Sequence, residues 1–235
     1  MFSSPSYCVG LILVVLYSSC AESHVNVRFY RIGGYEFSSS EQSVIQTIID
    51  ATTVEVGQML PTLPASLSLR VQPGQDVDPD TGEAATPRVP DVVYWTVSPT
   101  RAGGVSAIAR AQLRATLFHP FCYLARRAVV GSVDRLKDEV ISMGLATVFA
   151  RDFGGRSDPW GAYPLQVDAW VQEVLALPDD ARRDQWMDRH PDGRRWIGPK
   201  VGTYLVDRAV RASGRSVTDL VSAATDDIIR IALER

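Results

Sequence analysis

The stretch LRATLFHPFCYLARR, residues 113–127, lies where the chain changes from strand-like to helical patterning. Apolar residues recur in it at helical spacing, and that spacing begins near residue 104 and continues to the C-terminus. Before residue 104, several segments alternate apolar and polar residues, as half-buried strands do. Strands followed by helices predict an α+β fold, in which a small N-terminal β-sheet packs on a mainly helical C-terminal part.

The expected elements follow from these patterns. Strands are expected at residues 24–32, 66–72 and 91–97. A helix is expected over 38–60, because serines precede Glu41 and apolar residues then recur at helical spacing. Residues 73–90 carry many Asp, Gly and Pro residues and are expected to form a solvated connection. Further helices are expected over residues 105–118, 133–153, 165–177, 197–213 and 217–234.

Two details of the helical part make sharper predictions. Pro120 lacks an amide hydrogen, and its ring clashes with the carbonyl of Thr116 in a regular helix, at a cost of about 3 kcal/mol. We therefore expect a kink or a break at Pro120. Gly198 and Gly202 are four residues apart and are expected to allow the close approach of a neighbouring helix.

The overall composition is that of a globular protein. The chain has 235 residues, of which 46% are hydrophobic and 22% are charged, and this length can bury one sizeable core. The formal net charge is -3, and we find no local basic patch in the sequence. The sequence therefore predicts a single domain without a nucleic-acid partner.

The N-terminus has the pattern of an export signal. Its first twenty residues carry no charged side chain and include an apolar run from Val9 to Leu16. The run ends in Tyr17-Ser18-Ser19-Cys20, which resembles the bacterial lipobox. We expect residues 1–19 to be a lipoprotein-like signal peptide and residues 20–235 to be one domain. Acyl chains on Cys20 would anchor that domain to a membrane on its periplasmic or extracellular face.

The helical stretch contains part of a metal-binding pattern. In His-Glu-x-x-His, the two histidines lie on one face of a helix and bind zinc, and the glutamate polarises the bound water. His119 occupies the first histidine position of this pattern. Pro120 stands at the glutamate position, and Tyr123 stands at the second histidine position.

The flanking sequence resembles a bacterial family of predicted zinc-dependent proteases, which are zincins of the gluzincin type. The resemblance rests on AIARAQLRATLFHPFCYLARRAV, DEVISMGLATVFARDFGG, PWGAY and HPDGRRWIGPKVGTYLVDRA, and it covers nearly the whole chain after residue 20. It implies a zincin-like fold with a cleft between the sheet and the helices. It also implies a third zinc ligand in a Ser-Glu-Gly-Leu-Ala motif, where this chain has Met143 in place of the glutamate.

These substitutions predict that the family's chemistry is lost. Of the three family ligand positions, only His119 keeps a zinc-binding side chain, because Tyr123 and Met143 replace the other two. Pro120 cannot act as the general base. No catalytic residue is therefore expected to be intact, and no cofactor is expected, although the resembled family binds zinc.

The favoured interpretation is a non-catalytic protein, a pseudopeptidase that binds a peptide or protein segment in the cleft. One alternative is an active zinc metallopeptidase in which a shifted set of donors restores the site. Another is a protein that binds copper(I) through the soft ligands His119, Cys122 and Met143. Cys122 is available for this because the signal peptide contains Cys8 and lipidation would occupy Cys20.

Overall fold

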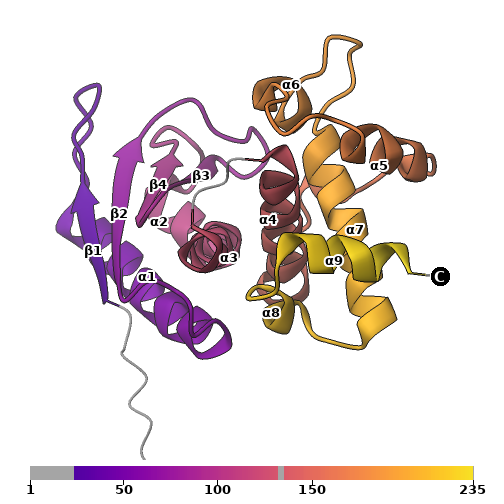
Figure 1. Cartoon of the computed structure of the whole chain (residues 1–235). Helices are drawn as coiled ribbons and strands as arrows, with labels where there is room; N and C mark the ends of the chain where they lie inside the picture. The colour runs from indigo at the N-terminus through magenta and orange to yellow at the C-terminus, as the bar shows by residue number, and fades with distance from the viewer. Residues whose placement is uncertain (1–23, 132–134, 235) are drawn as a thin grey trace, which may run out of the picture.

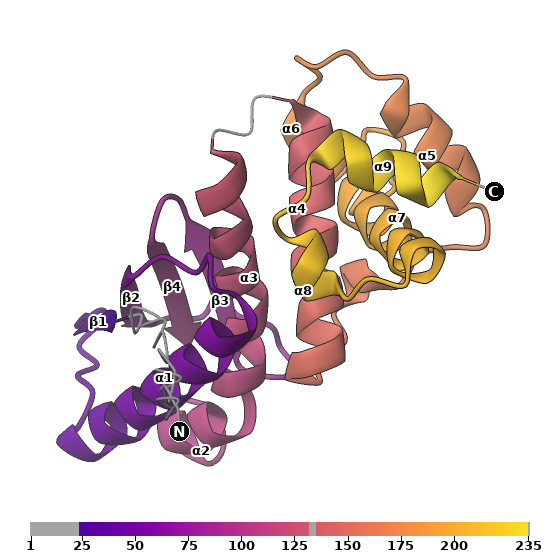
Figure 2. The same cartoon turned by 60° about the horizontal axis from the view of Figure 1, so that its bottom comes forward.

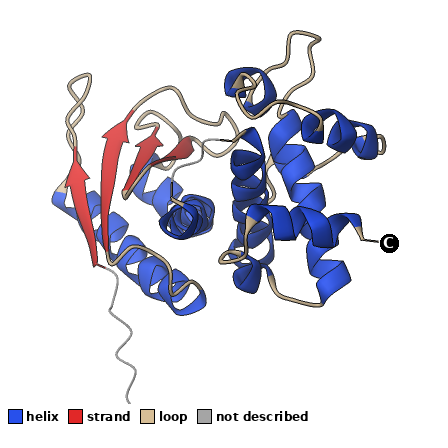
Figure 3. Ribbon diagram, in the orientation of Figure 1, coloured by secondary structure: helices blue, strands red, loops and turns tan. Residues whose placement is uncertain are grey.

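The computed structural model describes residues 24–131 and 135–234 (Figure 1). The expected signal peptide and the expected lipid anchor at Cys20 lie outside these residues. The described chain has an α+β fold, as predicted, with a sheet near its N-terminus and helices in the rest (Figure 3). Within the described residues, no helix is both long enough and apolar enough to cross a bilayer.

The sheet has four strands in the order β1-β2-β4-β3. Strand β1 runs parallel to β2, β2 runs parallel to β4, and β3 runs antiparallel to β4 at one edge. Their bounds are His24–Phe29 for β1, Ser66–Pro73 for β2, Glu83–Arg88 for β3 and Val92–Val97 for β4. The three strands expected from the sequence are confirmed as β1, β2 and β4.

Strand β3 corrects the prediction of a solvated connection over residues 73–90. Its sequence EAATPR has no alternation of apolar and polar residues, so its patterning gives no strand signal. Pro87 also weakens that signal, but proline is tolerated in a strand at the edge of a sheet. The strand depends on pairing with β4, which the local sequence does not reveal.

The helices lie on one side of the sheet and extend away from it (Figures 1 and 2). Helix α1 (Ser39–Met59) begins with the predicted capping box of Ser38 and Glu41 and contacts β1. Helix α3 (Arg114–Val130) contacts β3 and α1 on one side and α4 on the other. It therefore separates the sheet from the rest of the helical part. The elements just before and after α3 are α2 (Gly104–Ile108), the π-helix η1 (Ala109–Leu113) and α4 (Leu136–Phe149).

The remaining elements complete the helical part. They are the π-helix η2 (Ala150–Gly154), the 3-10 helix η3 (Pro159–Gly161), α5 (Val167–Leu175), α6 (Arg183–Met187), α7 (Ile197–Ser213), α8 (Val217–Leu220) and α9 (Thr225–Leu233). The single helix predicted over 217–234 is wrong, because α8 and α9 are separate. Ser216 caps α8, and the chain is extended at Ala224, immediately before α9.

Of the predicted kink or break at Pro120, the break is wrong, because helix α3 does not break there. The helix continues without interruption from Arg114 to Val130. Pro120 is buried, and its neighbours Phe118 and Phe121 are fully buried. Packing on several sides of α3 offsets the missing amide and holds the backbone helical.

Helices α4 and α7 touch through glycines. A Cβ added to Gly202 would lie 2.0 Å from the carbonyl oxygen of Val140, and one added to Gly144 would lie 2.3 Å from the backbone of Gly202. A Cβ added to Gly198 would meet the sulfur of Met187 at 2.5 Å. The predicted role in close helix approach is therefore confirmed for Gly202, whereas Gly198 packs against the side chain of Met187 on α6.

Candidate functional site

A cleft of about 1000 Å³ lies along β3. Helix α3 contributes Thr116, His119 and Pro120 to its wall. The segment after η2 contributes further wall residues, which are Arg156, Asp158 and Trp160. The cleft thus brings one residue of the zinc-like pattern, His119, next to the edge of the sheet.

A buried glutamate joins three elements at this cleft. Glu83, the first residue of β3, is fully buried. Its Oε2 accepts a hydrogen bond from Nε1 of Trp95 at 2.9 Å, and its Oε1 accepts one from the hydroxyl of Thr116 at 3.0 Å. Its Oε1 also lies 2.9 Å from a guanidinium nitrogen of Arg156. These contacts tie β3 to β4, to α3 and to the segment after η2.

Arg156 is the cation of this group. Its Nε lies 2.7 Å from the carboxylate of Asp158, which is also buried, and it donates a hydrogen bond to Thr116. Burial on its own would lower the pKa of Arg156, but Asp158 and Glu83 outweigh burial and raise it. The guanidinium therefore remains charged and compensates two buried carboxylates.

This arrangement does not fit zinc. The carboxylates of Glu83 and Asp158 face the guanidinium of Arg156, so both already have a cationic partner. In residues 24–131 and 135–234, no three His, Cys, Asp or Glu side chains form a group able to hold a metal ion. His119 is the one imidazole among the residues that line the cleft. One imidazole falls short of the three protein ligands typical of a catalytic zinc site.

His119 lies in the cleft wall beside Trp160, with the ring centroids 6.3 Å apart in an edge-to-face arrangement. Its Nε2 is buried and has no hydrogen-bond partner among the described residues. Burial lowers the pKa of His119 to about 4, and Arg156 acts in the same direction against the opposing effect of Asp158. The imidazole is therefore neutral at neutral pH.

The other two family ligand positions lie on facing helices. The hydroxyl of Tyr123 on α3 is 3.0 Å from both carboxylate oxygens of Glu139 on α4. Burial raises the pKa of Tyr123, and the charge of Glu139 raises it further, so the phenol stays protonated. Met143 lies one helical turn after Glu139 on α4. The two positions that the sequence resemblance predicts to be ligand positions thus hold a neutral phenol and a thioether.

Cys122 is fully buried and is a free thiol. Burial raises the pKa of this thiol, against a smaller opposing effect of Arg126. A raised pKa disfavours the thiolate, which is the form that binds metals. The environment of Cys122 is that of a small core residue.

Strand β3 leaves part of its backbone unpaired at the edge of the sheet. The amide of Ser98 donates to the carbonyl of Gly82 at 2.9 Å, and the register of β3 and β4 places these two residues opposite each other. Because hydrogen-bonded and non-hydrogen-bonded pairs alternate in an antiparallel ladder, the backbone groups of Glu83, Ala85 and Pro87 point away from β4. These groups form the free edge of β3.

Part of this free edge is already occupied. The carbonyl of Glu83 accepts a hydrogen bond from the amide of Asp78 at 3.2 Å. The amide and carbonyl of Ala85 and the carbonyl of Pro87 have no partner within the described chain. An extended segment lying in the cleft could form main-chain hydrogen bonds with these three groups.

The sequence did not predict Glu83, Arg156 or Asp158 as site residues. Glu83 and Arg156 are 73 positions apart, and neither stands in a recognisable motif. One usable signal was Trp95 on an expected buried strand, since a buried indole N–H needs an acceptor. That signal predicts that an acceptor exists but does not identify it.

Comparisons with known proteins add no family assignment. No family model matches the chain, and no curated protein or solved structure shows significant similarity to it. The resemblance to zinc-dependent proteases therefore remains a prediction from the sequence motifs.

Proposed function

We propose that the protein is a zincin-like pseudopeptidase, exported and lipid-anchored, that binds an extended peptide or protein segment along β3. The observation that carries the proposal is the free edge of β3, where Ala85 lines the cleft of about 1000 Å³. Main-chain pairing at such an edge gives affinity without any catalytic group. The side chains of the cleft wall support a non-catalytic role. Arg156 forms ion pairs with both buried carboxylates, and Pro120 cannot act as a general base.

Replacing Ala85 with Pro should weaken peptide binding strongly. The substitution removes the amide hydrogen of Ala85 at the free edge, while the bonds between β3 and β4 remain. The probes are fluorescein-labelled octapeptides in which Thr alternates with Glu, Gln or Lys. Fluorescence anisotropy with the purified chain should show binding of at least one octapeptide, and Ala85→Pro should weaken it by about tenfold or more.

Ala85→Ser is the matched control, because it keeps the amide and should bind like the unaltered chain. Circular dichroism should show that both variants are folded. The proposal of a peptide-binding edge is wrong if none of the three octapeptides binds. It is also wrong if a folded Ala85→Pro variant binds them with unchanged affinity.

Restoring the family's donors should create a zinc site. The triple variant Pro120→Glu, Tyr123→His and Met143→Glu supplies the side chains that the resembled family has beside His119. We expect it to retain about one zinc ion per chain after dialysis, measured by mass spectrometry of the metal content. Adding His119→Ala to the triple variant should remove that zinc.

The unaltered chain is the reference in this experiment and should retain no stoichiometric metal. A full equivalent of zinc in it, together with peptidase activity that a chelator abolishes, would instead support the shifted-donor metallopeptidase. A full equivalent of copper(I) would support binding by His119, Cys122 and Met143. A folded triple variant that fails to hold zinc would contradict the zincin-like arrangement of α3 and α4.

A further inference from the structure

The charges around the cleft are of two kinds. Inside the cleft wall, the guanidinium of Arg156 pairs with the carboxylates of Glu83 and Asp158 at distances of 2.7 to 2.9 Å. These groups are unavailable to a bound segment, because displacing one partner would leave another charge buried and unpaired. The charges open to a ligand are therefore the remaining ones along the cleft.

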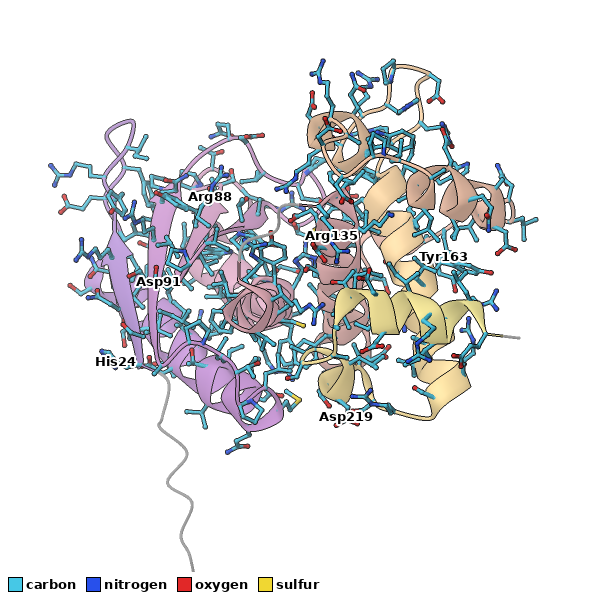
Figure 4. All side chains as sticks on the ribbon, in the orientation of Figure 1. His24, Arg88, Asp91, Arg135, Tyr163 and Asp219 are labelled. Atoms are coloured by element: carbon cyan, nitrogen blue, oxygen red, sulfur yellow. The ribbon has the colours of Figure 1, made fainter. Side chains whose placement is uncertain are left out.

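Three arginines remain, and none of them forms a salt bridge with a described residue. They are Arg70 on β2, Arg88 at the end of β3, and Arg195 just before α7. Arg70 donates to the hydroxyl of Tyr94, and the guanidinium of Arg195 lies 4.2 Å from the ring centroid of Trp196. Both interactions leave the positive charge uncompensated. Arg88 is exposed and projects from the sheet half of the molecule (Figure 4).

The remaining acidic residues of the cleft are fewer. Asp76 is exposed, whereas Asp78 uses its Oδ1 to accept hydrogen bonds from the amides of Asp80 and Thr81. Both aspartates precede β3 and lie near its first residue, because Asp78 bonds to Glu83. The second half of β3 therefore faces arginines without nearby carboxylates from this loop.

The register of the sheet shows where these arginines would meet a bound segment. Thr86 pairs with Tyr94, and Tyr94 pairs with Arg70, so these three side chains lie in one row across the sheet. Strands β4 and β3 lie between Arg70 and the free edge, which puts Arg70 out of reach of a segment added there. Arg88 is two residues after Thr86 and therefore projects from the same face. A segment added to β3 would present every second side chain to this face, beside Thr86 and Arg88.

We propose that the segment bound along β3 is acidic, with carboxylate side chains at alternate positions that meet Arg88 and Arg195. The inference rests on the proposed peptide-binding function and adds the chemical class of the partner. Exposed ion pairs contribute modestly one at a time, but two together should favour an acidic over a neutral segment by about tenfold.

The test compares the three labelled octapeptides on the purified chain at low salt. The Thr-Glu octapeptide should bind about tenfold more tightly than the Thr-Gln octapeptide, and the Thr-Lys octapeptide should bind most weakly. In the double variant Arg88→Gln and Arg195→Gln, the preference for Thr-Glu over Thr-Gln should fall to about threefold or less. The preference of the unaltered chain should also shrink at high salt, because the arginines are near the surface.

Arg110→Gln is the matched control, because Arg110 is exposed on η1 and does not line the cleft. It should leave the preference unchanged. Equal binding of the Thr-Glu and Thr-Gln octapeptides would overturn the acidic preference and leave the peptide-binding proposal standing. If Arg110→Gln reduces the preference as much as the double variant does, the assignment of the preference to the cleft arginines is overturned and the peptide-binding proposal stands. Absence of binding by all three octapeptides would overturn both.

Discussion

Replacing Arg156 with Ala should lower the free energy of unfolding by about 3 to 5 kcal/mol. The substitution leaves Glu83, which is fully buried, and Asp158, which is 7% exposed, without their shared cation. An unpaired buried carboxylate is costly because it has lost its hydration without gaining a compensating charge. Urea unfolding followed by tryptophan fluorescence measures the change.

Two further variants make this prediction specific. Adding Glu83→Gln to Arg156→Ala should recover part of the stability, because the amide removes the charge and its oxygen still accepts from Trp95. Arg182→Ala breaks an ion pair with Asp184 in which both side chains are more than 60% exposed, and it should leave the urea midpoint nearly unchanged. If Arg156→Ala unfolds at the same urea concentration as the unaltered chain, the ionic group does not stabilise the cleft.

Arg156→Lys covers the case in which Arg156→Ala does not accumulate as a folded protein. Lysine keeps the positive charge but cannot reach both carboxylates with a planar pair of donors. It should give a stability between those of the unaltered chain and the Arg156→Ala,Glu83→Gln variant. A lysine variant as stable as the unaltered chain would show that charge alone is sufficient.

Replacing Gly202 with Ala should destabilise the protein by about 3 kcal/mol or more. The new methyl group would lie 2.0 Å from the carbonyl oxygen of Val140, and backbone atoms cannot move aside as a flexible side chain can. Helices α4 and α7 would have to separate, which would open the packing of the buried residues between them. A thermal melt followed by circular dichroism should show a large fall in the melting temperature.

Ala212→Leu is the control for this substitution, because Ala212 is an exposed residue on the same helix. It adds more atoms than Gly202→Ala but meets solvent, so the melting temperature should change little. Similar melting temperatures for Gly202→Ala and the unaltered chain would mean that α4 and α7 are further apart than described.

The sequence predicts the elements whose signals are local. Strands β1, β2 and β4 and helix α1 follow from periodicity and from the capping box at Ser38 and Glu41. The glycines at positions 198 and 202 also carry a local signal, because their spacing marks one face of a helix. Strand β3 has no such signal, since its conformation depends on β4 and on the buried contacts of Glu83.

The residues of the candidate site also differ in whether the local sequence predicts them. His119 can be predicted as a cleft residue because it stands within a recognisable helical pattern. The ion pair of Glu83 with Arg156 cannot be predicted from local sequence, because the fold brings together two residues that are far apart in the chain. The break predicted at Pro120 was wrong because local sequence shows the cost of proline in a helix but not the packing that offsets it.

The contact between Gly144 and Gly202 bears on how the chain could be re-engineered. Since two backbones touch there, α4 can neither slide along α7 nor turn about its own axis without losing the contact. Met143 immediately precedes Gly144, so its height and azimuth on α4 are set by main-chain atoms. Grafting a new chemistry at position 143 would therefore be a problem of side-chain length and charge, with the scaffold already immobilised.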